Sequence, residues 1–464
     1  MRNKILFLIA ACVGVAYLIH TAGNVQTSTL VVIIVFFVTL GISFVRGVDA
    51  LYIIVFAMLF SPEIGTSLTT GKVAGGEGAG AITLRLEDIL LVAVGCGWLL
   101  RTAYDKRQFG IVRTGVNTAI GVYIAACVVA TLLGVIGGTV NLMTGVVHNL
   151  KFFEYFFLFF MILAHVRSKK IITKMLIAMI VVFSLAMIFG YTQIELTGIK
   201  RVVAPFDSGE SNTFGGYIVL LMCVIFGIVL ADPRTRVRVP LILLLLFALP
   251  PFLFTLSRAS YMAFIAGCLA FLAVSQQRIV VGAIIIVMVA IPLIGVTILP
   301  VKVQNRITGT FQADPEFHEK IGNIDLDSSA SARIVSYQQA LEIWEKSPLF
   351  GHGVTGTHFI DGQYFRLLAE TGIIGLAAFL FVLWRLLGEV REVYKHCEDY
   401  FLKGAALGLF CGIIAMMVHA ISANSFIIIR IAEPLWLMAG LILLIPRLGD
   451  AEETTVPAAI QPLA

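Results

Sequence analysis

Long apolar runs recur along the whole of this chain. A run of about 20 apolar residues can cross the hydrocarbon core of a bilayer as a single helix. If each run crosses once, the pattern predicts about 12 to 14 transmembrane helices. The number is a range because some of the runs are short for a membrane crossing. The runs fall near residues 5–20, 27–45, 50–60, 87–100, 115–136, 152–165, 171–192, 213–231, 239–254, 259–275, 279–299, 371–390, 403–422 and 425–446. The sequence therefore predicts an all-α polytopic integral membrane protein.

The composition agrees with a membrane protein and excludes several other classes. Of the 464 residues, 59% are hydrophobic and only 13% are charged, whereas about 25% of a soluble globular chain is charged. The excess of 33 Lys and Arg over 28 Asp and Glu is small, so it indicates no nucleic-acid partner. The seven cysteines form no CxxC pair, so neither a disulfide framework nor a zinc site is indicated.

The basic residues between the apolar runs agree with one orientation. Loops rich in Lys and Arg stay on the cytoplasmic side of a membrane. With a cytoplasmic N-terminus, that side receives the basic residues Arg46, Arg101, Lys106, Arg107, Arg113, Arg167, Lys169, Lys170, Arg234, Arg236, Arg238, Arg278, Arg391, Lys395, Lys403 and Arg447. We therefore expect both termini in the cytoplasm and an uncleaved first span.

This topology divides the chain into four parts. Residues 1–300 hold the first eleven predicted helices, and 301–370 form one large outer loop. Residues 371–447 hold the last three predicted helices, and 448–464 form a polar tail that we expect to be disordered.

The outer loop contains one strong helix pattern. Ile334, Tyr337, Leu341 and Trp344 recur at helical spacing, with Ser331 as the expected N-cap and Pro348 as the stop. This pattern predicts an amphipathic helix on the outer membrane surface. Arg333 lies in its first turn, where the helix dipole disfavours a cation, so we expect an anionic partner for it.

The stretch from Gly351 to Gly375 joins this loop to the next apolar run. Asp361 lies where the polar loop meets the membrane, and Glu370, Gly372 and Gly375 follow it. A carboxylate at the mouth of a transmembrane helix is a functional candidate. Asp is also among the commonest helix N-caps, so capping is an equal alternative for Asp361.

Two other predicted outer turns carry polar residues. Glu210 and Asn212 precede a span that begins with a Gly pair, which would let another helix approach closely. The turn TLSRAS holds Ser257 and Arg258. Arg258 either extends to the headgroup region or takes part in a functional site. The two interpretations have equal weight, and the polar neighbours of Arg258 support the second.

Charged and polar residues also occur within the last two apolar runs. His419 closes one run beside Ser422 and Asn424. Arg430 and Glu433 are one helical turn apart, and a buried ion pair explains them without chemistry.

Five motifs in this order resemble the O-antigen ligase and Wzy-type polymerase family. They are SNTFGGY at 211–217, TLSRAS at 255–260, SSASARIVSYQQALEIW at 328–344, SPLFGHG at 347–353 and DGQYFRLLAETGIIGL at 361–376. The similarity covers roughly residues 205–385. It implies a GT-C-like glycosyltransferase of the bacterial inner membrane. Such enzymes take a glycan from undecaprenyl diphosphate on the periplasmic side and attach it to another glycan or to lipid A core.

The resemblance assigns roles to individual residues. Arg258 and Arg333 match the two arginines that are thought to hold the diphosphate. Asp361 and Gly362 stand where ligases typically carry a His-Asn pair, ahead of the matching Gly372 and Gly375. This departure makes the chain more similar to an exopolysaccharide or O-antigen polymerase than to a ligase.

The residue types suit an inverting transfer that uses neither a metal nor a cofactor. Guanidinium groups stay charged and offer paired donors to phosphate oxygens, so Arg258 and Arg333 would stabilise the diphosphate leaving group. A carboxylate can accept the proton of the attacking hydroxyl, with Asp361 as first candidate and Glu210 as second. We expect supporting roles for Asn212, Ser257, Glu370, Gly372 and Gly375.

Two alternatives remain from the sequence. A ligase would transfer the finished glycan to lipid A core or another acceptor, and a lipid-linked oligosaccharide flippase would move its substrate without chemistry. A transporter is expected to show internal repeats, and no repeat is evident here. The expected partners are the bilayer, the undecaprenyl-diphosphate-linked donor and acceptor, a chain-length regulator and export proteins, but no nucleic acid.

Overall fold

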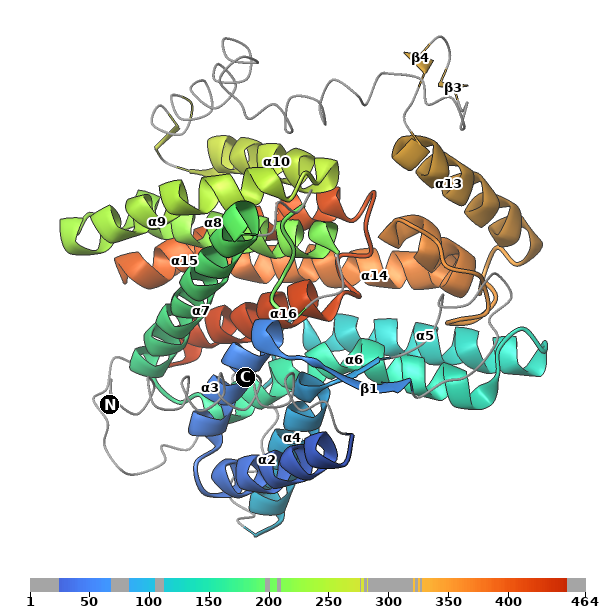
Figure 1. Cartoon of the computed structure of the whole chain (residues 1–464), viewed down its shortest axis with the longest axis horizontal. Coiled ribbons are helices and arrows are strands. Elements are labelled where there is room, and N and C mark those ends of the chain that lie inside the picture. The colour runs from blue at the N-terminus through green and yellow to red at the C-terminus, as the bar shows by residue number, and fades with distance from the viewer. Residues whose placement is uncertain are drawn as a thin grey trace.

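The computed structural model describes residues 25–67, 83–104, 112–196, 201–206, 210–275, 277–278, 282, 320–321, 324–325 and 328–448. These residues form α-helices and two small hairpins (Figure 1). The helices are α2 (Val25–Val45), α3 (Gly47–Phe60), α4 (Leu86–Tyr104), α5 (Asn117–Ile136), α6 (Leu142–His165), α7 (Lys169–Leu196), α8 (Ser211–Ala231), α9 (Thr235–Phe254), α10 (Arg258–Val274), α13 (Ser328–Lys346), α14 (Gln363–His396), α15 (Tyr400–His419), α16 (Ile429–Leu444) and the 3₁₀ helix η3 (Ile445–Arg447). The hairpins pair β1 (Glu63–Ser67) with β2 (Thr83–Arg85) and β3 (Lys320–Ile321) with β4 (Ile324–Asp325).

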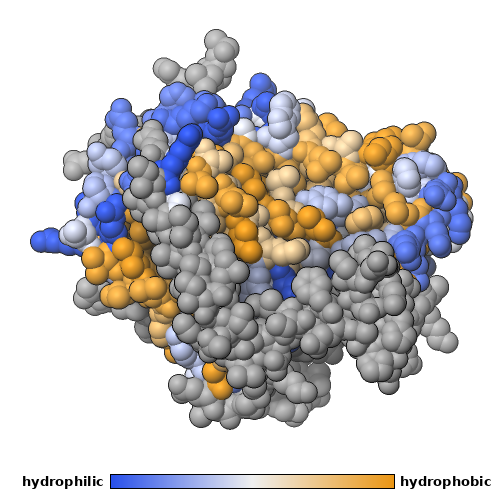
Figure 2. All heavy atoms as spheres, turned by 90° about the horizontal axis from the view of Figure 1, so that it is seen from above, coloured by the Kyte–Doolittle hydropathy of each residue, from blue (hydrophilic) through white to orange (hydrophobic). Residues whose placement is uncertain are grey.

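The predicted fold class is confirmed. Among the described residues, eight helices are long and apolar enough to span a membrane. Three shorter apolar helical stretches accompany them, at Val31–Val45, Gly47–Phe60 and Arg258–Val274. Figure 2 shows apolar side chains gathered across the middle of one face, with hydrophilic side chains at its left and right edges. A bilayer slab fits such a band. The predicted span 5–20 and all of the predicted span 279–299 except residue 282 lie outside the described residues, so the total number of crossings and the four-part division stay predictions.

Helix α6 begins earlier than the apolar run at 152–165 indicates. Its N-cap is Asn141, whose Oδ1 accepts hydrogen bonds from the backbone N–H of Met143 at 3.0 Å and of Thr144 at 3.3 Å. A side-chain oxygen at this position satisfies N–H groups that the helix itself leaves unpaired. The apolar run at 152–165 is short for a membrane span, but the helix that contains it starts after this N-cap and has 24 residues.

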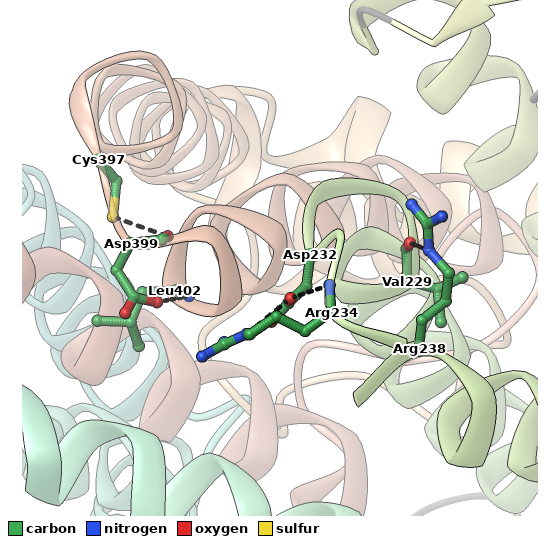
Figure 3. Close-up of polar contacts among 7 residues, drawn as sticks. All are labelled: Val229, Asp232, Arg234, Arg238, Cys397, Asp399 and Leu402. Carbon is green, nitrogen blue, oxygen red and sulfur yellow. Dashed lines mark hydrogen bonds and ion pairs between the residues drawn. The ribbon is translucent and has the colours of Figure 1, made fainter. Parts of the chain in front are cut away.

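The basic loops meet at one end of the helix bundle, which we call the basic end. Arg101 and Arg167 lie near His165, and Lys169 and Lys403 lie near Cys397. On the same side, Arg234 binds the buried Asp232 after α8 and lies near Asp399, whose carboxylate caps α15 (Figure 3). This grouping is what the charge pattern of the loops predicts if they share one side of the membrane.

The opposite end of the bundle, which we call the site end, collects the other helix termini. Helices α8, α10 and α14 begin there, and α15 ends there at His419. The predicted site residues Glu210, Arg258 and Asp361 stand just before or at the start of these three helices. The candidate site therefore lies at the end remote from the basic loops.

Helices α8 and α15 pack with their backbones in close contact. A Cβ atom on Gly408 would lie 2.4 Å from the Cα of Val224, and one on Gly404 would lie 2.5 Å from the Cα of Ile228. Glycine recurs every fourth residue on this face of α15, a spacing that lets membrane helices approach. The Gly pair of α8 is also at a close contact, as predicted, because Gly215 adjoins Ser260 and Gly216 adjoins His419.

The outer-loop helix exists as predicted, but it starts earlier than expected. Helix α13 begins three residues before the expected N-cap Ser331. Ala340 is buried, because α13 packs through it against Phe365 and Ala369 of α14. Leu341 is 38% exposed, so the protein does not cover it. That the apolar side chains of α13 face the membrane surface stays a prediction.

Candidate functional site

Asp361 lies directly before α14, at a position that its surroundings fix tightly. Its backbone N–H donates to the hydroxyl of Ser336 in α13 at 3.1 Å. The N-cap of α14 is Gly362, with φ +87°, and no side chain caps this helix start. A Cβ on Gly362 would lie 2.6 Å from the carbonyl oxygen of Ile421. The capping alternative for Asp361 is therefore not supported, and its carboxyl is available for another purpose.

Arg333 places a positive charge close to this carboxyl. Burial raises the pKa of Asp361 above its ordinary value, and the charge of Arg333 offsets part of that rise. The Nε of Arg333 is buried and has no hydrogen-bond partner among the described residues. The anionic neighbour expected for Arg333 is thus present as a charge nearby, although the two residues form no ion pair within 4 Å.

Tyr337 links Arg333 and Asp361 to the rest of the site end. Its ring stacks on Phe365 with the ring centroids 4.2 Å apart. Its hydroxyl donates to the carbonyl oxygen of Ile421 at 2.7 Å. Because the stack and the hydrogen bond join α13, α14 and the loop after α15, they fix the helix that carries Arg333.

Arg258 is the first residue of α10, and its neighbour Ser257 is the N-cap. The Ser257 hydroxyl accepts from the backbone N–H of Ser260 at 3.3 Å. The two serine hydroxyls are 2.8 Å apart. Ser257 is buried and caps the helix that begins at Arg258. A supporting role for Ser257 would therefore consist of fixing the start of this helix.

Glu210 and Asn212 stand at the start of α8, on the same end of the bundle. The Glu210 carboxylate accepts a hydrogen bond from the Thr213 hydroxyl at 2.7 Å. The backbone of Asn212 lies against His419. Of the two candidate carboxylates, Glu210 therefore has a hydroxyl donor on its own helix, whereas Asp361 has the charge of Arg333 nearby.

Glu370, Gly372 and Gly375 lie deeper, and they shape a loop that follows α13. Glu370 is buried and its Oε1 accepts from the Arg366 Nε at 3.1 Å and from the backbone N–H of Thr355 at 3.3 Å. The backbone N–H of Gly353 donates to the Glu370 carbonyl at 2.8 Å. These residues are not next to Asp361 and act on the loop that leads to it.

The helix α14 is broken at Gly372, which has φ +64° and ψ −167°. Only glycine occupies this region readily. The break frees backbone groups, and the loop 348–353 bonds to them: Ile373 N–H donates to the Pro348 carbonyl at 2.9 Å. A Cβ on Gly372 would lie 2.3 Å from the Leu349 carbonyl oxygen.

We expect Gly372→Ala to destabilise the protein measurably. Backbone strain alone should cost about 1–3 kcal/mol, and the clash with Leu349 adds to it. Thermal unfolding in detergent would measure the change. Gly388→Ala is the matched control, because Gly388 lies in the same helix with nothing within 4 Å of its Cβ position. An equal melting temperature for the two variants would contradict the strained break.

A buried histidine joins the segments that carry these residues. His419 is 0% exposed, and its Nε2 is 3.1 Å from the Ser260 hydroxyl. Its Nδ1 is 2.7 Å from the Ser425 hydroxyl. The sequence indicated a histidine at the end of an apolar run, but it offered no partner for it. The partner Ser260 is 159 residues away, and only the packing of α10 against α15 brings the two together.

Arg430 lies under the site end, with polar partners that the sequence did not indicate. Its guanidinium donates to the carbonyl oxygens of Pro205 at 3.1 Å and Ser61 at 3.5 Å. The salt bridges between described residues do not include the expected pair with Glu433. Arg430 therefore ties α16 to two loops through backbone carbonyls.

Within the described ranges, no three or more His, Cys, Asp or Glu side chains are grouped in a way that could hold a metal ion. Metal independence stays a prediction that rests on the pair of arginines.

A comparison with known protein families gives a match. Residues 241–380 match the sequence model of a family described as O-antigen ligase. The matched segment includes Arg258, Arg333 and Asp361 and begins after Glu210 and Asn212. No curated protein matches the chain.

Proposed function

Because residues 241–380 match the O-antigen ligase family, we propose that this multi-pass membrane protein is a glycosyltransferase that polymerises undecaprenyl-diphosphate-linked repeat units. The observation that carries the proposal is the neighbourhood of Arg333 and Asp361. Burial raises the pKa of the Asp361 carboxyl and the nearby Arg333 charge offsets part of that rise, at the same end of the bundle where Arg258 begins α10. A cation that can bind diphosphate and a carboxylate that can take a proton are the two groups this reaction needs.

The chemistry assigns a separate task to each group. The acceptor sugar hydroxyl attacks the anomeric carbon of the donor, and the bond from that carbon to the diphosphate oxygen breaks. The diphosphate leaves with the electron pair, and Arg258 and Arg333 stabilise its charge. The hydroxyl proton passes to the Asp361 carboxylate. Attack opposite the leaving group inverts the configuration at the anomeric carbon.

The basic end supports a periplasmic site in the bacterial inner membrane. Arg101, Arg234 and Lys403 are at the end remote from Asp361, and basic loops stay in the cytoplasm. This orientation faces the candidate site to the periplasm and leaves both termini in the cytoplasm. Undecaprenyl-diphosphate-linked glycans on the periplasmic leaflet would reach the site from the membrane.

The family description also favours a second candidate, a ligase that transfers glycan to lipid A core or another acceptor. The residues at 361 and 362 favour the polymerase, because Asp-Gly stands where ligases typically carry His-Asn. Both reactions use the same donor, so the diphosphate site is common to them and only the acceptor differs.

Elongation by the purified protein in detergent tests the proposal. The substrate is the lipid-linked repeat extracted from a strain in which this protein has been deleted. A polymerase converts single repeats into a ladder of longer lipid-linked products. A ligase leaves single repeats unchanged until a lipid A core acceptor is added. No glycosyl transfer with either acceptor would refute the proposed activity, and a flippase would give that result because detergent leaves no second compartment.

A further inference from the structure

His419 lies at the centre of a buried hydrogen-bond network that the proposed reaction does not use directly. Both of its ring nitrogens face serine hydroxyls, Ser260 at 3.1 Å and Ser425 at 2.7 Å. A hydroxyl can donate or accept, so a neutral imidazole satisfies both contacts at once. The side chain is fully buried, so we assign it no contact with the substrate.

One arm of the network leads to Arg258. The Ser260 hydroxyl is 2.8 Å from that of Ser257, which caps α10. Gly215 of α8 leaves no room behind Ser260, because a Cβ there would lie 2.3 Å from its hydroxyl oxygen. The first turn of α10 is therefore held between α8 and His419, and the backbone of Arg258 is held with it.

The other arm leads to Asp361 and Arg333. Ser425 belongs to the segment 420–428, which follows α15. Backbone oxygens of this segment accept from the Gln363 N–H at 2.9 Å and from the Tyr337 hydroxyl at 2.7 Å. The amide of Asn424 donates to the Ile360 carbonyl at 3.1 Å. The segment thus contacts α13 on one side and the residues flanking Asp361 on the other.

The space around the imidazole leaves little freedom for the ring. A Cβ on Gly216 would lie 3.0 Å from its Cε1, so α8 closes one side of the ring. The two hydroxyls fix its remaining orientation. The ring is closely packed and makes two directed hydrogen bonds. A shift of the imidazole should therefore displace Ser260 and Ser425 with it, because a close-packed interior does not absorb small shifts.

We propose that His419 is a positioning residue, which through Ser260 and Ser425 sets the distance between Arg258 and the pair formed by Arg333 and Asp361. This role rests on the proposed glycosyl transfer, because it concerns how two arginines converge on one diphosphate. A misplacement of about 1 Å at such a site can lower the rate by about 10²-fold.

The test compares three variants of the full chain. His419→Leu removes both hydrogen bonds but keeps an apolar side chain in the space. His419→Gln retains a polar end and should restore part of the effect. The matched control is His396→Leu at the basic end, where the His396 side chain is 76% exposed.

The first measurement requires no substrate. Spin labels are attached to cysteines that replace Met262 in α10 and Leu341 in α13, whose side chains are 48% and 38% exposed. We expect His419→Leu to shift or broaden the distribution of distances between the labels, and His396→Leu to leave it unchanged. This result is independent of catalysis, so it stands even if the proposed activity fails.

The second measurement uses undecaprenyl diphosphate as the probe. We expect His419→Leu to weaken its binding by about 10-fold, with partial recovery in His419→Gln. Ser260→Ala should also weaken binding, and its effect should be smaller in the His419→Leu background than in the wild type, because both changes break the contact between Ser260 and His419. A purely structural histidine would change the folded fraction but leave the affinity of the folded protein as it was.

Each result decides the proposal. Unchanged label distances in His419→Leu overturn it, and so do changed distances with unaltered affinity for undecaprenyl diphosphate. If His419→Leu does not fold, His419→Gln and Ser425→Ala are judged by the same two measurements. A wild-type protein that binds the probe but transfers no sugar rejects the proposed function and leaves the positioning role intact.

Discussion

Arg333→Ala is expected to reduce the rate of glycosyl transfer by about 10²- to 10³-fold, the usual loss when one group that stabilises developing negative charge is removed. The diphosphate leaving group gains charge as its bond to the sugar breaks, and a guanidinium in a partly dehydrated site stabilises that charge strongly. Arg333 is only partly buried and its Nε has no hydrogen-bond partner among the described residues, so we expect its guanidinium to bind a phosphate oxygen. Turnover of lipid-linked repeats by purified protein measures the effect.

The controls separate charge from geometry. Lys346 lies in the last turn of the same helix and is exposed, so Lys346→Ala should leave turnover unchanged. Arg333→Lys keeps the charge but loses the planar pair of donors, and we expect an intermediate rate. If the turnover of Arg333→Ala is within a factor of two of the wild-type value, the assignment of Arg333 to the diphosphate site is wrong.

Local features of the sequence were enough to predict the helical membrane fold, and they also select the candidate residues, whose roles stay predictions. Spans follow from apolar length, and orientation follows from basic loops. Arg258 and Asp361 stood out because a charge at the end of an apolar run is costly. These signals depend on neighbours in sequence, which is why they can be read without a structure.

Features that depend on distant contacts could not be predicted. The break at Gly372 lies against the Leu349 carbonyl of a preceding loop, whereas Gly388 lies in the same helix without breaking it. The contact of Ala340 in α13 with Ala369 in α14 joins two helices whose pairing no local pattern indicates. His419 depends on Ser260, and no periodicity joins residues so far apart in the chain.

The carboxylate of Asp361 should give the pH profile an acidic limb above the ordinary range of an aspartate. Burial raises its pKa, and Arg333 opposes that rise, whereas an unperturbed Asp has a pKa of about 3.9. A general base acts in its ionised form, so the rate should fall as pH decreases through this raised pKa. Arg333→Lys should leave the limb near its wild-type position, because the positive charge remains.

Asp361→Asn is expected to lower turnover by about 10²- to 10⁴-fold and to abolish the acidic limb of the pH profile.

The same substitution should not lower the stability of the protein. A folded-state pKa above the unfolded value means that folding disfavours the ionised carboxylate, and this penalty is fully present at pH values above the folded pKa. At pH 7 the asparagine variant should therefore unfold at the same temperature as wild type or higher, as measured in detergent. Loss of activity together with a lower melting temperature would indicate a structural role instead. Glu210→Gln provides the comparison, and a larger loss there than in Asp361→Asn would transfer the role of base to Glu210.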